Sequence, residues 1–296
     1  MSALDVGSGT GRLSILLADL LPVLSGIDWA RHQTVNSIAM DSREVGDQCL
    51  WLALQGGREH ALEYLDEARH RGAVAVLAEP SGRWDRERIA ALSDDLPVIA
   101  VPGLRRQAGE IAARFFGQAA QSMRVIGVTG TNGKTSVASF LAQALSTRVP
   151  TAVLGTVGNG FPDHLEPSTH TTLDAVNLHA TLGALFARGA RAVAMEVSSH
   201  ALHQERVAGV PFHTSVFTNL SREHQDYHGS MQDYADAKAR LFRVAGLTTA
   251  VINVDDAVGA RLAADVRPRI YTVALGSGSG AVRLGDRYLQ ISEEQE

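Results

Sequence analysis

The sequence has little cysteine and no excess of basic residues. Cys49 is the single cysteine among 296 residues, so an internal disulfide is impossible, which favours a reducing compartment over secretion. The 27 Lys and Arg residues are outnumbered by 32 Asp and Glu, giving a formal net charge of −5. Broad binding of nucleic acid or of an anionic membrane needs clustered positive charge, so we expect neither partner.

A long hydrophobic run is also missing. The most apolar stretch near the N-terminus, residues 13–27, contains Asp19 and Pro22 and is too short to span a bilayer. We therefore expect a soluble cytoplasmic protein, a monomer, without membrane insertion. With 45% apolar and 20% charged residues, the chain can bury one large core or two medium ones, which excludes disorder, coiled coil and collagen.

Lysine is scarce among the basic residues. Only Lys134 and Lys238 are lysines, and the other 25 basic residues are arginines. An amine differs from a guanidinium because it is a compact charge that can lose its proton and be modified. Two lysines in such a chain are either there by chance or mark positions where the chemistry needs an amine.

Short apolar runs alternate with helical stretches, which is the pattern of an α/β protein. The predicted helices are residues 60–71, 104–116, 135–145 and 173–188, and the predicted strands are residues 49–54, 73–79, 96–102, 125–128, 151–156, 192–197, 214–220, 250–254 and 270–275. Because these strands do not alternate with polar residues, we predict a mostly parallel sheet that is buried on both faces. We expect a domain boundary near Gly103, which gives domains of residues 1–103 and 104–296.

Residues 127–136 have the sequence GVTGTNGKTS, between a predicted strand and a predicted helix. Small residues in this position let backbone N–H groups surround phosphate oxygens at the positive end of the helix. Lys134 would then reach the terminal phosphates, and the Thr135 hydroxyl would face Mg²⁺. Val128 stands where the commonest spacing has glycine, so this phosphate loop is a variant of that pattern.

A second glycine-rich run, LDVGSGTG at residues 4–11, resembles the cofactor loop of a methyltransferase that uses S-adenosylmethionine. Only three residues precede this run, and the sequence from Ala39 onward does not continue that fold. We therefore interpret residues 1–12 as a flexible extension. A methyltransferase and an unrelated P-loop phosphotransferase remain open as alternatives.

Polar residues gather where the predicted strands end, at residues 129–134, 196–200, 219–228 and 253–256. Ligands of such sheets bind beyond the carboxyl ends of the strands. Glu196 and His224 lie at or near two of these ends, and a carboxylate there can hold a hard cation beside a triphosphate. Eight of the eleven histidines fall between His164 and His228, but their spacing argues against a metal cage.

Several segments resemble the Mur ligases in their order and spacing. They are TGTNGKTS, HTTLDAV, MEVSSHALHQERV, VFTNLSREHQDYHG, AK and INVDD, preceded by DSREVGD and LALQGG, and they cover residues 38–256. The resemblance implies an ATP-dependent ligase of peptidoglycan precursor synthesis. Such an enzyme would add the third amino acid, expected to be meso-diaminopimelate, to UDP-MurNAc-L-Ala-D-Glu through an acyl phosphate.

The same resemblance implies a small N-terminal α/β uridine-nucleotide domain followed by a P-loop ATP-binding domain with a mostly parallel sheet. It further implies that the ATP-binding domain is incomplete at its end and that the third domain of the family, which binds the incoming amino acid, is absent. A non-catalytic fragment that binds UDP-sugar and nucleotide without ligating them is therefore an alternative.

The resemblance also assigns roles to individual residues. Those for ATP are Gly130, Thr131, Asn132, Gly133, Lys134, Thr135 and Ser136, with Asn253 near the adenine. Those for Mg²⁺ are Thr135, Glu196, His224 and Lys238, the last as an N-carboxylated lysine; Lys134, Lys238, Glu196 and His224 are the catalytic set. Those for the UDP-MurNAc dipeptide are Met40, Ser42, Gly57, Arg58, Glu59, His170, Thr171, Thr172, Ser198, Gln204 and Arg206.

Three residues depart from the family's pattern. His170 replaces a common Asn, and His60 with Ala61 replaces a common Asp-Gly. Arginine could not replace Lys238 in the implied role, because only a neutral amine is nucleophilic enough to take up carbon dioxide.

Overall fold

The computed structural model describes residues 15–21, 24, 26–168 and 171–274, and the backbone of residues 281–284 and 287–290. The glycine-rich run at residues 4–11 therefore lies outside the described residues. The chain forms two compact units, one of residues 1–119 and 175–184, the other of residues 120–174 and 185–296.

The division after residue 119 differs from the expected boundary near Gly103. Helix α4 (Leu104–Phe115) accounts for the difference, because its Leu104, Ala108 and Ile111 are fully buried in the core of the first unit. A helix that buries its apolar face in this way belongs to the unit that it packs against.

The first unit contains a parallel four-stranded sheet in the order β3-β4-β5-β6. Its strands are β3 (Ser37–Ala39), β4 (Cys49–Ala53), β5 (Ala73–Ala78) and β6 (Val98–Ala100), and a separate antiparallel pair joins β1 (Ile15–Leu16) to β2 (Thr34–Val35). Its helices and helical turns are α1 (Leu17–Leu20), η2 (Trp29–Arg31), η3 (Ser42–Glu44), η4 (Ala61–Tyr64), α2 (Leu65–Arg71), α3 (Arg86–Ala90) and α4.

Strand β4 shows why its apolar run does not alternate with polar residues. Leu50 and Leu52 pack in the core that contains α4, whereas Trp51 and Ala53 pack in the core that contains α2. Successive side chains of a strand point to opposite faces, so both faces of this sheet are buried. The predicted burial on both faces is confirmed for this strand.

The second unit is built on a ten-stranded sheet in the order β10-β9-β8-β11-β7-β12-β13-β14-β15-β16. The six strands from β8 to β14 in that order are parallel, as predicted. They are β7 (Arg124–Thr129), β8 (Thr151–Gly155), β11 (Ala192–Glu196), β12 (Phe212–Phe217), β13 (Thr249–Asn253) and β14 (Arg269–Ala274).

Antiparallel strands extend both edges of this sheet, which the sequence did not predict. They are β9 (Gly158–Phe161), β10 (His164–Glu166), β15 (Ala281–Leu284) and β16 (Arg287–Gln290). Strands β9 and β10 are short and contain Gly158, Gly160 and His164. Without an apolar run, they gave no strand signal.

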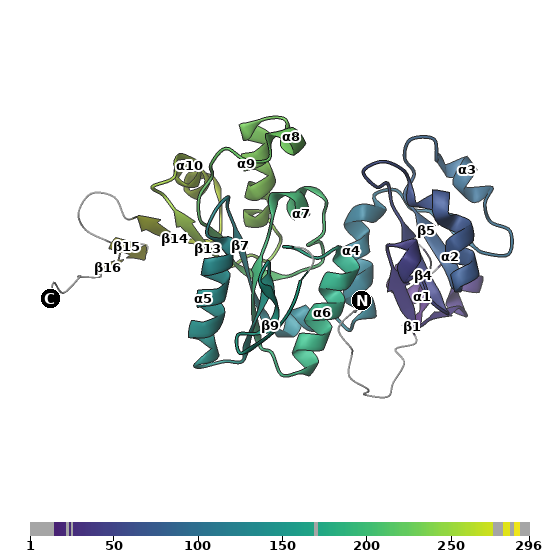
Figure 1. Ribbon diagram of the computed structural model, residues 1–296, viewed down its shortest axis with the longest axis horizontal. Helices are drawn as coiled ribbons and strands as arrows, with labels where there is room; N and C mark the ends of the chain where they lie inside the picture. Colours follow the sequence, from purple (N-terminus) through teal and green to yellow (C-terminus); the bar gives the residue numbers. More distant parts are fainter. Residues whose placement is uncertain are drawn as a thin grey trace. The chain divides into compact units, whose positions relative to one another are not determined.

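Helices cover both faces of the second sheet (Figure 1). The helices of this unit are η5 (Ala119–Ser122), α5 (Lys134–Ser146), α7 (Ser199–His203), α8 (Gln225–His228), α9 (Met231–Ala239), η6 (Arg240–Phe242) and α10 (Ala257–Asp265). Helix α6 (Ala175–Ala187) is divided between the two units. On one face, Ala138 and Ala142 of α5 share a core with Val128 of β7. On the other, a Cβ built on Gly127 would lie 3.2 Å from Leu241 Cδ1 of η6. None of the helices in the described part of the chain is long and apolar enough to cross a membrane.

Candidate active site

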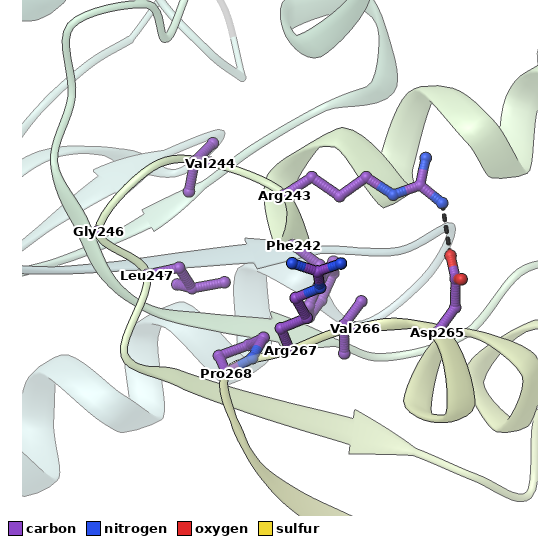
Figure 2. Close-up of a pocket in the computed structure, with 9 residues that line it drawn as sticks. All are labelled: Phe242, Arg243, Val244, Gly246, Leu247, Asp265, Val266, Arg267 and Pro268. Atoms are coloured by element: carbon purple, nitrogen blue, oxygen red, sulfur yellow. Dashed lines mark hydrogen bonds and ion pairs between the residues drawn. The ribbon is translucent and has the colours of Figure 1, made fainter.

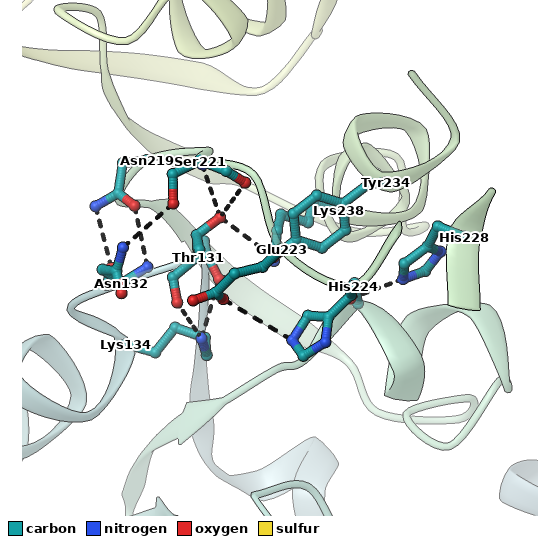
Figure 3. Close-up of polar contacts among 12 residues, drawn as sticks. Thr131, Asn132, Lys134, Asn219, Ser221, Glu223, His224, His228, Tyr234 and Lys238 are labelled. Atoms are coloured by element: carbon teal, nitrogen blue, oxygen red, sulfur yellow. Dashed lines mark hydrogen bonds and ion pairs between the residues drawn. The ribbon is translucent and has the colours of Figure 1, made fainter. Parts of the chain in front are cut away.

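The loop between β7 and α5 is held in place by Asn219, which follows β12. The Asn219 carbonyl accepts a hydrogen bond from Thr131 N at 2.8 Å, and its Oδ1 accepts one from Asn132 N at 3.0 Å (Figure 3). Gly133 has φ +83° and immediately precedes α5. Because N–H groups in the first turn of a helix have no partner within the helix, this end of α5 is suited to bind an anion. The strand–loop–helix arrangement is as predicted.

The two lysines of the chain meet at one carbonyl of this loop. Lys134 Nζ donates to Gly130 O at 3.0 Å and to Thr131 O at 2.8 Å, and Lys238 Nζ donates to Gly130 O at 2.8 Å. Lys238 is buried, and its Nζ lies 4.4 Å from the ring centre of Tyr234. The structure therefore brings together the two lysines that the sequence analysis singled out.

Burial changes the acid–base chemistry of both amines. Desolvation, followed by the charge of Lys134, lowers the pKa of Lys238 from 10.5 to about 7. Desolvation also lowers the pKa of Lys134, against an opposing effect of the Glu196 carboxylate. At neutral pH a large share of Lys238 is thus a neutral, nucleophilic amine.

Glu196 ends β11 beside the first turn of α5. Its Oε2 accepts from Thr135 Oγ1 at 2.9 Å, and its Oε1 accepts from Thr156 N at 2.7 Å. A Cβ built on Gly155 would lie 2.1 Å from Glu196 Oε1, so glycine leaves the room that this carboxylate occupies. A threonine hydroxyl and a carboxylate are the hard oxygen donors that Mg²⁺ prefers, and the two residues fit that ion.

The other two predicted metal ligands are not joined to this pair. His224 lies before α8 with φ +55°, its Nε2 is 3.9 Å from Glu223 Oε2, and its ring centre is 4.8 Å from that of His200. Within the described residues no hydrogen bond links His224 to Glu196, and no group of three or more His, Cys, Asp or Glu side chains could hold a metal ion. The roles of His224 and Lys238 in metal binding stay predictions.

Four residues assigned to the dipeptide substrate gather at the end of β11. Thr172 Oγ1 donates to Glu196 O at 3.0 Å and accepts from Ser198 N at 3.2 Å. Arg206 donates to Thr172 O at 3.1 Å and to Gln204 Oε1 at 2.8 Å. Chain segments before and after β11 are thus tied together at the backbone carbonyl of Glu196.

Thr171 joins the same cluster, because its Oγ1 accepts from Thr156 Oγ1 at 3.1 Å. His170 lies outside the described residues. Asn253, assigned to the adenine, donates from Nδ2 to Thr218 O at 2.7 Å and so joins the ends of β13 and β12. Its role toward adenine is not tested by this contact.

The remaining residues assigned to the substrate, Met40, Ser42, Gly57, Arg58 and Glu59, belong to the first unit. Ser42 Oγ donates to Glu67 Oε2 at 3.0 Å, and Glu59 accepts a hydrogen bond from the Tyr64 hydroxyl.

His60, which departs from the family's Asp-Gly pattern, is buried and caps η4. Its Nδ1 accepts from Leu62 N at 3.1 Å, and its Nε2 pairs with Glu79 O at 2.8 Å. The imidazole therefore supplies the acceptor that a helix N-cap needs.

Several residues that support the loop were not predicted. Thr131 Oγ1 lies 3.2 Å from the buried Tyr234 hydroxyl and accepts from Ser221 N at 2.9 Å. Thr218 Oγ1 donates to Asn132 O at 2.6 Å. Thr218, Asn219 and Ser221 follow the end of β12, which was the available signal, whereas Tyr234 gave none. The Thr131 side chain therefore contacts Tyr234 and Ser221, whereas its backbone N–H bonds to Asn219 O.

A pocket of about 590 Å³ lies elsewhere in the second unit (Figure 2). It is lined by Phe242, Arg243, Val244, Gly246, Leu247, Asp265, Val266, Arg267 and Pro268, with Arg243 and Asp265 paired at 2.7 Å. These residues precede β13 and β14 and therefore lie at the amino ends of the strands. Ligands of parallel sheets bind at the opposite ends, so we assign the chemistry to the loop and not to this pocket.

Comparison with known proteins identifies the family of the chain. The Mur ligase middle domain matches residues 128–295. The chain is 51% identical over 252 residues to the UDP-N-acetylmuramoyl-L-alanyl-D-glutamate–2,6-diaminopimelate ligase of Alkalilimnicola ehrlichii. This match covers 84% of the chain and 50% of the relative. It is 47% identical over 236 residues to the ligase of the same name from Pseudomonas aeruginosa, and this match covers 79% of the chain and 47% of the relative.

A solved structure of a ligase with that name superimposes with a TM-score of 0.78 at 29% identity, covering 94% of this chain and 59% of that one. The chain thus spans about half the length of the curated relatives that it matches. The family model covers more than half of the chain, and its match includes the loop before α5 and both lysines. The chain therefore belongs to the Mur ligase family.

Proposed function

We propose that this chain supplies the nucleotide site of an ATP-dependent ligase that joins diaminopimelate to UDP-N-acetylmuramoyl-L-alanyl-D-glutamate in peptidoglycan precursor synthesis. Relatives that carry the name of this activity are 51% and 47% identical to it. The single observation that carries the proposal is the convergence of Lys134 and Lys238 on Gly130 O. Glu196 lies at the same end of the sheet, held by Thr135.

The proposed reaction joins two anions before it forms an amide. The substrate carboxylate attacks the γ-phosphorus of ATP, which yields an acyl phosphate and ADP, and the amine of the amino acid then displaces phosphate. Carboxylate and triphosphate repel each other, so positive charge must lie where they meet. Lys134 and the first-turn N–H groups of α5 supply that charge from fixed positions.

When bound, Mg²⁺ would neutralise part of the negative charge of the triphosphate. Thr135 and Glu196 are the residues that would hold it, since their oxygens are already 2.9 Å apart. Thr156 N and Gly155 support this position, because the first donates to the carboxylate and the second leaves room for it.

We propose that Lys238 is carboxylated at Nζ. Two observations support this: the amine is buried, and its pKa of about 7 leaves much of it neutral at physiological pH. A carbamate would turn a buried cation into an anion with two oxygen donors. We expect Lys238→Ala to be inactive and to regain part of its activity with a short added carboxylate. Full activity of this variant without added carboxylate would contradict the carbamate.

The dipeptide end of the UDP-linked substrate is proposed to bind where Thr172, Ser198, Gln204 and Arg206 meet. Arg206 suits this position because a guanidinium can bind the carboxylate that is to be activated. Its bonds to Thr172 and Gln204 fix its orientation beside Glu196. Met40, Ser42 and residues 57–59 are proposed to contact the rest of the substrate from the first unit.

Calorimetric titration tests the proposal with three ligands: a non-hydrolysable ATP analogue with Mg²⁺, UDP-MurNAc-L-Ala-D-Glu and S-adenosylmethionine. We expect heat of binding from the first two only. Lys134→Ala should lose the ATP analogue, whereas Arg148→Ala, which removes an exposed charge beyond the other end of α5, should bind it like the wild type.

Protein with UDP-MurNAc-L-Ala-D-Glu then receives ATP and diaminopimelate, and phosphate release is measured. Phosphate release that depends on both ATP and diaminopimelate supports a ligase. Binding without release would identify a non-catalytic binding fragment, and binding of S-adenosylmethionine alone would support a methyltransferase.

A further inference from the structure

Thr129, the last residue of β7, carries a hydroxyl without a partner. Its side chain is fully buried, and Oγ1 has no hydrogen-bond partner within the described residues. In the described part of the second unit, Thr129 Oγ1 is the only buried side-chain nitrogen or oxygen atom without a hydrogen-bond partner. Buried polar groups of native proteins are nearly always hydrogen-bonded, so an unpaired hydroxyl beside a functional loop indicates that a bound or added group supplies its partner.

The direction of this side chain follows from the pleat of β7. Val128 packs in the core with α5, so its neighbours Gly127 and Thr129 point to the opposite face. On that face a Cβ built on Gly127 would lie 3.2 Å from Leu241 Cδ1. Leu241 stands three residues after Lys238, at the end of the same helical segment. The Thr129 hydroxyl thus faces the layer that carries Lys238.

Lys238 approaches the chain next to Thr129. Its Nζ donates to the carbonyl of Gly130, the following residue, at 2.8 Å. The neighbouring hydroxyls are already in use, because Thr131 Oγ1 bonds to Ser221 N and Thr218 Oγ1 donates to Asn132 O. The hydroxyl of Thr129 is therefore a buried donor that remains available on the face of β7 that η6 covers, one residue away from the carbonyl that Lys238 contacts.

We propose that Thr129 donates a hydrogen bond from Oγ1 to an N-carboxyl group on Lys238 and acts as a positioning residue for it. This rests on the carboxylation of Lys238 given under the proposed function. Valine has nearly the same shape as threonine and needs no partner, so a buried threonine is favoured here only if its hydroxyl gains an acceptor.

The covalent step needs carbon dioxide and no oxidant or reductant. The lone pair of neutral Nζ attacks the carbon of CO₂, forming an N–C bond, while one C=O π pair moves onto oxygen. Nζ then releases one proton to solvent, which leaves an N–H group and a carboxylate. The new carboxylate oxygens are acceptors, and in the proposal one of them accepts the hydrogen bond from Thr129 Oγ1.

The experiment measures carboxylation directly. Wild-type protein is equilibrated with ¹³C-bicarbonate, and the carbamate signal is recorded by ¹³C NMR, with Lys238→Ala to assign it. We expect Thr129→Val to lower the affinity for CO₂ about tenfold or more, because the lost bond goes to a charged acceptor, and Thr129→Ser to restore it. Thr151→Val is the matched control, since Thr151 is also fully buried but already donates to Val149 O at 2.8 Å.

Equal labelling of wild type and Thr129→Val would overturn the inference and leave the carbamate intact. Absence of label at Lys238 in the wild type would remove the carbamate, and this inference with it. Thermal unfolding without bicarbonate gives a second readout: Thr129→Val should melt at or above the wild-type temperature, because it removes an unpaired hydroxyl. A clearly lower melting temperature would mean that the hydroxyl already has a protein partner, and would also overturn the inference.

Discussion

Gly130 is a position where one added methyl group should destabilise the fold. Its φ is +147°, which side chains rarely adopt, and a Cβ there would lie 1.9 Å from Thr218 Oγ1. The same Cβ would lie 3.1 Å from the backbone N and O of Asn219, which hold the loop. Gly130→Ala therefore meets both a backbone restriction and a steric overlap.

The loss of stability caused by Gly130→Ala is the sum of two contributions, backbone strain and a lost hydrogen bond. Backbone strain in a region that only glycine favours costs about 1–3 kcal/mol. To relieve the overlap, the Thr218 hydroxyl must leave Asn132 O, its acceptor at 2.6 Å, which costs about 1 kcal/mol. We expect Gly130→Ala to lower the free energy of unfolding by about 2–4 kcal/mol.

Urea unfolding of the wild type and the variant measures this difference. Gly246→Ala is the matched control, because Gly246 has φ +80° but open space around its Cβ, and it should cost only about 1 kcal/mol. In a Thr218→Ala background the same Gly130→Ala change should cost only the backbone strain of about 1–3 kcal/mol, because the overlap and the hydrogen bond to Asn132 O are both already absent there. A change below about 0.5 kcal/mol for Gly130→Ala would refute the reasoning, because it is the size of an ordinary surface substitution.

Three further predictions concern the charged groups. Gly155→Ala should displace the Glu196 carboxylate and weaken ATP-analogue binding with Mg²⁺ but not without it; calorimetry showing equal loss in both would contradict this. The pKa of Lys238, lowered by burial to about 7, makes the wild type lose about 5 kcal/mol of stability as pH falls from about 10.5 to 7, with no further change below. In CO₂-free buffer, the free energy of unfolding of Lys238→Met, measured with urea at a series of pH values, should lack this pH dependence. The same pH dependence in the wild type and the variant would exclude the lowered pKa of Lys238. Lys134→Ala should raise the barrier to phosphate release by on the order of 3 kcal/mol, and near-normal release would rule out its proposed role.

Local sequence patterns were enough for most of the second sheet. The runs at β7, β11 and β13 are apolar because both faces of these strands are covered, and each was predicted close to its observed bounds. The short strands β9 and β10 were missed because they carry glycine and polar residues and have no apolar run. The boundary near Gly103 differed from the observed division because a helical pattern does not reveal which core the helix joins.

The sequence by itself determined the α/β alternation, the loop that ends in Lys134 and the family, because these depend on residues that are neighbours in the chain. Only the tertiary structure placed Lys238 on the same carbonyl as Lys134, set Glu196 against Thr135 and left the Thr129 hydroxyl unpaired. The partners in these contacts come from β7, α5, β11 and α9, which are far apart in the chain. They meet because parallel strands align their carboxyl ends at one edge of the sheet, and no local pattern encodes which side chains face each other there.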